Sequence, residues 1–130
     1  MSTPLSLVGR KAQLLGLRAV LGQAVFYAGL PPATPDEAPA GALLGHVLLA
    51  SPAGVVGDAA GLATLTLDGP QIANATATGV IGFIRFATAD GSGVLDVQAG
   101  LAAAGLPAVV NALQVYAGGE VQLLSCVIKQ

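Results

Sequence analysis

The sequence predicts a mainly β fold, an antiparallel β-sandwich of jelly-roll type that follows an N-terminal α-helix. Short runs rich in Val, Ile, Leu, Phe and Thr recur at intervals of about 8 to 20 residues, with Gly, Pro, Asp and Asn between them. The first stretch differs, because its apolar residues recur at helical spacing. We therefore expect an N-terminal helical segment at 1–22 and one β-sandwich domain at 23–130.

The helix is predicted over residues 5–21. Its apolar side consists of leucines at helical spacing, namely Leu7, Leu14, Leu15 and Leu21, with Val8, Ala12 and Val20 beside them. Its polar side carries the basic residues Arg10, Lys11 and Arg18. Ser2 or Ser6 is expected to cap its start, and Gly22 stands where a helix usually ends. The segment either packs on its own sandwich or reaches a neighbouring subunit.

Seven strand-like runs follow the helix, at 24–28, 42–50, 62–67, 78–88, 94–98, 109–116 and 120–128. The run at 42–50 is mostly apolar, is bounded by Gly41 and Pro52, and is predicted to be a buried strand. The turn at 89–93 joins the runs on either side of it into a hairpin, and Gly118-Gly119 is predicted to be a second hairpin turn. Four prolines in 30–40 indicate a loop, because proline disrupts both helix and inner strand.

The surface that the composition predicts is poor in charge. Hydrophobic residues make up 54% of the 130 residues and charged residues only 9%, against roughly 25% in an ordinary domain. Charged side chains keep the surfaces of soluble proteins apart. We therefore expect self-association to cover much of the outside of this chain, with an exposed strand edge or apolar face as the contact.

The charge of the chain argues against a nucleic-acid partner, and the Gly and Pro residues in its apolar windows argue against a membrane. The formal net charge is −2 and the five basic residues are scattered, so no patch for nucleic acid is expected. The uncharged windows 38–57 and 97–119 are interrupted by Gly and Pro, which favours turns between strands over membrane spans. Met1–Gly9 has no basic region before an apolar stretch, so a secretory signal is not expected.

No constellation of residues predicts catalysis, a metal or a cofactor. His46, Ser51 and Asp58 contain the groups of a nucleophile, a base and an orienting acid, but nothing in the sequence brings them into contact. The turn at Asp90 offers one carboxylate, too few for calcium. Cys126 stands alone among apolar residues, which excludes an internal disulfide and indicates a buried side chain. We expect a protein that is not an enzyme.

Arg85 is a charged residue within an apolar strand, where burial of an unpaired charge is costly. Asp96 on the next run, or Asp68, is its expected partner. Two interpretations stay open: a salt bridge between subunits that fixes their register, or an arginine that faces water. The first predicts that Arg85→Ala loosens an assembly more than the fold.

The order of the parts resembles the small β-sandwich head decoration (cement) proteins of tailed bacteriophages. The resemblance lies in the segments "IANATATGVIGFIRFATADGSGVLDVQAG" and "LQVYAGGEVQLLSCVI". The matching positions are Thr78-Gly79, Phe83, Arg85, Phe86, Ala89-Asp90-Gly91, Val94, Asp96, Gly100, Gly118-Gly119, Val121 and Ser125. The chain departs from the pattern at Phe83, where a larger aromatic is usual, and at "AGLAAAGLPAVVN", which replaces a polar loop.

The resemblance implies a structural protein of the virion, made in the bacterial cytoplasm and bound to the outer surface of the capsid. Its partners would be the major capsid protein and copies of itself, with a homotrimer preferred and a homodimer as the alternative. The candidate contacts are the faces of 42–50 and 107–116, the N-terminal segment, and the residues Arg10, Lys11, Arg18, Arg85 and Asp96. A different class remains open: a tail-associated or secreted carbohydrate-binding module. The scarcity of aromatic residues, at 4% with no Trp, disfavours it.

Overall fold

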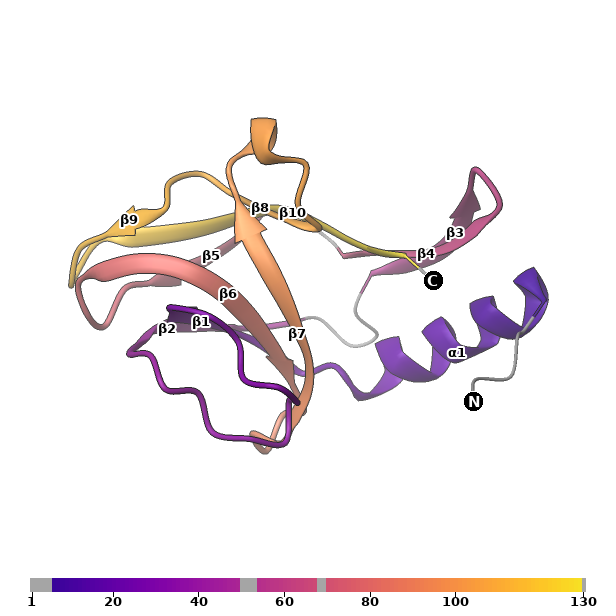
Figure 1. Cartoon of the computed structure of the whole chain (residues 1–130), viewed down its shortest axis with the longest axis horizontal. Coiled ribbons are helices and arrows are strands. Elements are labelled where there is room, and N and C mark those ends of the chain that lie inside the picture. The colour runs from indigo at the N-terminus through magenta and orange to yellow at the C-terminus, as the bar shows by residue number, and fades with distance from the viewer. Residues whose placement is uncertain (1–5, 50–53, 68–69, 130) are drawn as a thin grey trace.

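The fold is mainly β with one N-terminal helix, as expected (Figure 1). A computed structural model describes residues 6–49, 54–67 and 70–129. Its elements are α1 (Leu7–Val20), β1 (Gln23–Ala28), β2 (Leu43–Leu48), β3 (Val55–Ala59), β4 (Leu62–Leu67), β5 (Gln71–Asn74), β6 (Gly79–Ala87), β7 (Gly93–Gly100), a 3₁₀ turn (Ala102–Ala104), β8 (Ala108–Val110), β9 (Gln114–Val115) and β10 (Glu120–Lys129).

The helix begins at the serine that the sequence offers as a cap. The Ser6 hydroxyl accepts a hydrogen bond from the Gly9 N–H, which satisfies one of the free donors of the first turn. The helix ends at Val20, before Gly22 as predicted. Ser2 lies outside the described residues. Leu14 is fully buried in the core that the strands share, so the helical segment and the β domain form one core.

The described strands form one curled, mixed sheet in the order β2-β1-β6-β7-β8-β10-β4-β3. β5 pairs with β10, and β9 pairs with β6, outside this path. All pairs are antiparallel except β7 with β8, where Ala99 and Gly100 lie beside Ala108 and Val109. The expectation of an entirely antiparallel set is wrong at this pair. The short 3₁₀ turn and its flanks bring β8 back beside the end of β7 in the same direction.

The curl folds two arms of the sheet over a single core. The arm β2-β1-β6-β7 supplies Phe26 and Phe86, and the arm β8-β10-β4 supplies Leu65 and Leu123, all within one cluster of buried side chains. Each of these side chains is at most 1% exposed. Burial of a side chain of this size stabilises the fold by roughly 1.5–3 kcal/mol.

The strongest predicted strand, at 78–88, forms β6, which pairs with a strand on each side. β1 pairs along one side and β7 along the other, which confirms the hairpin through 89–93. The register with β1 shifts at Gly82, between Phe83 and Ile81. A Cβ at Gly82 would lie 1.7 Å from the Gly29 carbonyl oxygen, so only glycine allows this close approach.

Two strands, β3 and β5, were not predicted, because their residues do not show the alternation of apolar and polar residues that is typical of a strand. β3 and β4 form a hairpin through Ala60-Gly61, with both residues at positive φ (51° and 80°). Positive φ at both central positions is the geometry of a type I′ hairpin turn. Ala60 is the only described non-glycine residue in this region of φ.

Two predicted runs and one predicted turn differ in the structure. The run at 42–50 forms β2, which is an edge strand with Leu44 buried but Leu43, His46 and Leu48 exposed. The run at 109–116 divides into β8 and β9, which pair with different partners. Since β9 pairs with β6, Gly118-Gly119 is a turn but does not close a hairpin with β10. Its backbone bonds to Ala75 instead.

Candidate functional site

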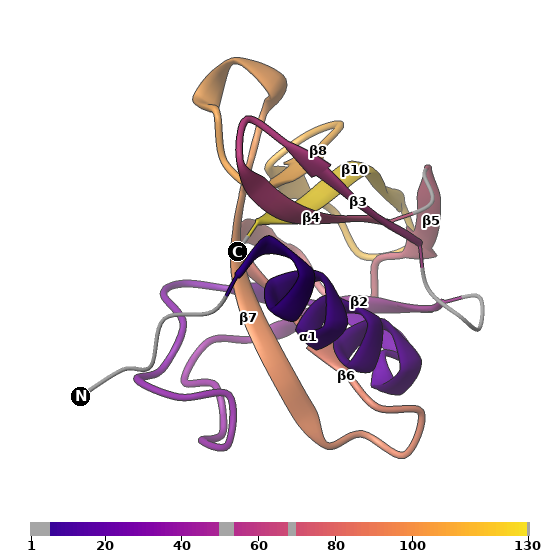
Figure 2. The same cartoon turned by 90° about the vertical axis from the view of Figure 1, so that its right-hand side faces the viewer.

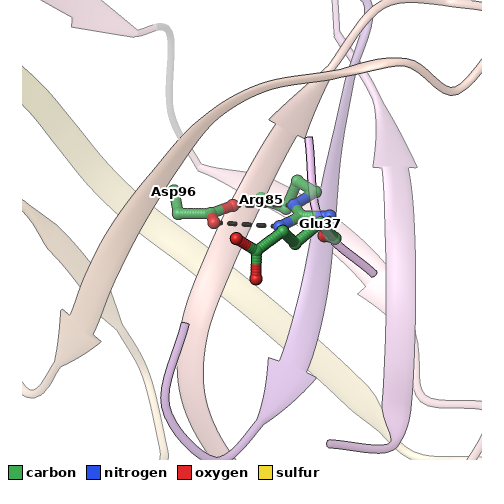
Figure 3. A network of polar contacts seen from close by, with 3 residues as sticks. All are labelled: Glu37, Arg85 and Asp96. Carbon is green, nitrogen blue, oxygen red and sulfur yellow. Dashed lines mark hydrogen bonds and ion pairs between the residues drawn. The ribbon is translucent and has the colours of Figure 1, made fainter. Parts of the chain in front are cut away.

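Arg85 and Asp96 form a buried ion pair across the β6–β7 hairpin (Figure 3). The two residues lie directly opposite in register, so their side chains reach each other without strain. Arg85 Nε donates to Asp96 Oδ1 at 2.7 Å, and Nη2 donates to Oδ2 at 3.0 Å. The two side chains are only 9% and 8% exposed. This fork geometry is the strongest arrangement of arginine with a carboxylate.

The third nitrogen of the guanidinium binds the proline-rich loop at residues 30–40. Arg85 Nη1 donates to the Glu37 carbonyl oxygen at 2.7 Å. The hydrogen bonds that Arg85 donates to Asp96 are the main reason that the pKa of Arg85 lies above its ordinary value; burial acts in the opposite direction. The pair therefore fastens residues 30–40, which contain no helix or strand, to the sheet.

The pair Arg85–Asp96 forms within one chain, and a contact of these two residues with a second subunit stays a prediction. The interpretation of a water-facing Arg85 is wrong, because the side chain is buried. Asp96 rather than Asp68 is the partner; Asp68 lies outside the described residues.

The basic residues of α1 contact the β3–β4 hairpin of their own chain. Arg10 Nη2 donates to the Gly61 carbonyl oxygen at 3.0 Å, and Arg18 Nη1 to that of Gly54 at 3.4 Å. Lys11 Nζ lies 3.4 Å from Asp58 Oδ1. Figures 1 and 2 show α1 running alongside this hairpin. The predicted polar side of the helix therefore faces the fold, which is the internal packing considered in the sequence.

Within the described residues, the candidate catalytic groups do not meet. His46 is exposed on β2 and lies opposite Val25 of β1. Asp58 lies on β3, at the other end of the strand order from β2, and pairs with Lys11 of α1. Ser51 lies outside the described residues. Of the described candidates, His46 and Asp58 therefore lie on opposite edge strands and do not form a pair of base and orienting acid.

Asp90 and Cys126, the other two candidate groups, have surroundings that are typical of a structural role. Asp90 accepts a hydrogen bond from the Thr88 hydroxyl in the β6–β7 turn, and this bond is the main reason for its lowered pKa. Cys126 is buried as predicted, and loss of water raises the pKa of its thiol to about 12. The described residues contain no group of three His, Cys, Asp or Glu side chains placed to hold a metal ion.

One groove opens where β7 diverges from β8 and the end of β10. Its volume is about 540 Å³, and most of its lining is apolar. The apolar lining residues are Leu95, Val97, Leu106, Pro107, Val109, Val127 and Ile128. Asp96 also lines it, but both of its carboxylate oxygens accept hydrogen bonds from Arg85. Ser125 and Lys129 add a hydroxyl and an amine to a lining that is otherwise mostly apolar.

The surface itself is the most unusual feature of the structure. Thirteen large hydrophobic side chains of the described residues are exposed: Val8, Leu15, Val20, Leu30, Leu43, Leu48, Val55, Leu62, Ile72, Val80, Leu101, Tyr116 and Leu124. Several belong to the faces that the sequence predicted as contacts, with Leu48 at 70% and Tyr116 at 66% exposed. Where such side chains gather into a contiguous patch, they mark a site of association. The exposed side of α1 was not predicted as apolar, although Val8, Leu15 and Val20 all lie on it.

Comparison with known proteins identifies no relative. No family model matches the chain, and neither a curated protein nor a solved structure is significantly similar to it. No helix among the described residues is long and apolar enough to cross a membrane.

Proposed function

We propose that this chain is a structural component of an assembly, which acts by covering its apolar surface with other subunits. The observation that carries the proposal is that thirteen large hydrophobic side chains among the described residues are exposed, in a chain with only 9% charged residues. The charges that do exist are partly used inside the fold, as with Arg85 and Asp96. A surface that is poor in charge and rich in exposed apolar side chains favours association with a partner.

The assembly that we propose is the head of a tailed bacteriophage, where the chain would decorate the outer surface of the capsid and bind the major capsid protein. The sequence pattern shared with the head decoration proteins supports this assignment. The β-sandwich form that this resemblance implies belongs to the same proposal. It is supported by the curl of the sheet, which brings two arms over one core.

A carbohydrate-binding module is the competing proposal, and the described aromatic side chains argue against it. Sugar rings stack on exposed aromatic faces, whereas here the three phenylalanines are buried and Tyr27 stacks on Phe83 with 5.3 Å between the ring centroids. Tyr116 is exposed by itself. A single ring offers little area for a sugar chain.

The experiment is co-sedimentation of the purified chain with heads from the phage or prophage whose genome encodes it. Saturable binding, with a fixed number of copies per head and greater resistance of the heads to heating, is the expected result. The control is the same mixture with heads of an unrelated phage. Binding to a polysaccharide panel without binding to heads would replace the proposal with the carbohydrate module.

A further inference from the structure

The outer face of α1 is apolar, which is the reverse of an ordinary surface helix. All three charged residues of α1 contact the β3–β4 hairpin. Apart from Gln13, the side chains left exposed are apolar or small: Val8, Ala12, Leu15, Gly16, Ala19 and Val20. Val8 is 78% exposed and Leu15 is 50% exposed. Figure 2 shows α1 nearest to the viewer, and no described element lies in front of it.

Four of these side chains form one line, which we name the α1 seam: Val8, Ala12, Leu15 and Ala19. They are spaced by four, three and four residues, so they fall within an arc of about 60° on the helix. This is the a/d spacing by which one helix packs against another with knobs in holes. The geometry of the seam therefore fits a helix as its occupant, rather than a strand or a flat surface.

We propose that the α1 seam docks against α1 of a second copy of this chain, in an antiparallel pair about a two-fold axis. This inference rests on the proposed role in an assembly. In such a pair Val8 lies opposite Ala19 of the other copy, and Ala12 lies opposite Leu15. The two-fold axis repeats both contacts. Each large side chain then meets a small one, which is how close-packed layers interdigitate.

A parallel pair of the same helices would pack less well. It would place Ala12 opposite Ala12 and Ala19 opposite Ala19, which leaves voids, and Leu15 opposite Leu15, which keeps the helices apart. The alternation of large and small residues is thus complementary to itself only in the antiparallel direction. This self-complementarity is the reason that the seam fits a second copy.

Charge points to the same occupant. The seam carries no charge, so two identical copies do not repel each other, and an acidic or basic partner finds no opposite charge on it. A helix that lies on a membrane carries free Lys and Arg around its apolar face, whereas those of α1 contact the hairpin. At 14 residues the helix is about 21 Å long. A contact between two helices of this length buries a small area compared with the roughly 1,200–2,000 Å² of a stable interface. We therefore expect a dimer that dissociates on dilution.

The test is sedimentation velocity of the full chain between about 1 μM and 1 mM. The wild type is expected to change from monomer to dimer across this range. Leu15→Glu is expected to weaken association at least about 100-fold, because two carboxylates per dimer would lose water at the seam. Ala12→Glu is a second variant, since Glu is a good helix former and leaves the isolated helix intact. The control is Leu101→Glu, at a loop residue that is 45% exposed, which should dimerise like the wild type.

The direction of the pair is tested by cross-linking. A mixture of Val8→Cys and Ala19→Cys chains, of which one is tagged, is expected to form disulfides between unlike copies. Each variant by itself should not cross-link to itself. The native Cys126 is buried and does not interfere. Self cross-linking of Val8→Cys would overturn the antiparallel geometry.

The outcomes separate this inference from the proposed function. A wild type that stays monomeric at every concentration overturns the seam as a dimer interface. Dimers that persist in both glutamate variants show that the copies associate through another surface, which also overturns it. Loss of head binding by a monomeric Leu15→Glu chain, with a monomeric wild type that binds heads, assigns the seam to the capsid: the inference fails and the proposed function stands.

Discussion

Arg85 shows why a buried charge is costly to disturb on one side only. Its guanidinium makes three hydrogen bonds, two to Asp96 and one to the Glu37 carbonyl oxygen. Removal of the carboxylate leaves a buried positive charge with one partner, whereas removal of both charges leaves an apolar site. The two kinds of change should therefore have very different effects.

We predict that Asp96→Ala lowers the free energy of unfolding by about 3–5 kcal/mol. The double variant Arg85→Met/Asp96→Leu should recover most of this loss, because it removes both charges together. Urea unfolding of the wild type, the single variant and the double variant measures the effect.

The half-exposed pair Lys11–Asp58 is the matched control, and Asp58→Ala should lower the free energy of unfolding by less than about 1 kcal/mol. Equal losses for Asp96→Ala and Asp58→Ala would show that burial of the first pair has no energetic consequence. Arg85→Ala should also lower the stability of the fold, and the expectation that it loosens an assembly more than the fold stays a prediction.

The buried thiol of Cys126 should make the fold less stable at alkaline pH. Its thiol has a pKa of about 12 in the folded chain, against 9.0 for the exposed group. Between these values the unfolded chain has lost the proton and the folded chain retains it, so the unfolded state binds fewer protons and stability falls as pH rises above 9. Cys126→Val should reduce this loss, as measured by urea unfolding at pH 7 and pH 10. In the native protein the thiol should not react with a disulfide reagent at pH 8. Fast reaction without denaturant would contradict its burial.

At the scale of elements, the β3–β4 hairpin depends on its turn. Ala60 adopts a left-handed conformation that costs a residue with a Cβ roughly 1 kcal/mol, while Gly61 adopts a similar one without cost. Asparagine tolerates this region better than alanine does, and Asn-Gly is the preferred sequence of such a turn. The hairpin carries the contacts of α1, so its stability also supports the helix.

We predict opposite effects at the two turn residues. Ala60→Asn should raise the free energy of unfolding by up to about 1 kcal/mol, and Gly61→Ala should lower it by about the same amount. A Cβ at Gly61 meets no atom within 4 Å, so backbone strain rather than a clash is the cause. Thermal unfolding followed by circular dichroism gives both values. A gain from Gly61→Ala would show that the turn does not hold this geometry in solution.

At the scale of the whole molecule, the chain is expected to associate through apolar rather than ionic contacts. Apolar association does not weaken when salt screens charges, whereas ion pairs between exposed groups do. The mass of the assembly by light scattering should therefore be equal or greater at about 1 M salt than at about 0.1 M. Dissociation at high salt would assign the contacts to the few charged residues of the surface.

The sequence by itself determined the elements with strong local signals. Ser6 and Gly22 bracket α1, the β6–β7 hairpin follows from two apolar runs around a turn, and Cys126 is buried as predicted. The pair Arg85–Asp96 was one of two pairings considered, because a charge inside an apolar strand requires a partner.

Tertiary structure decided which face of each element is covered. In α1, leucines at helical spacing predicted one buried side, yet Leu14 is buried while Leu15 is half exposed. The basic residues turn inward because the hairpin presents carbonyl oxygens and Asp58 to them. In the same way, the parallel pair of β7 with β8 and the split of 109–116 depend on contacts between distant segments. Hydrophobic periodicity identifies an apolar face, but only the neighbours in space determine whether it is the core or an interface.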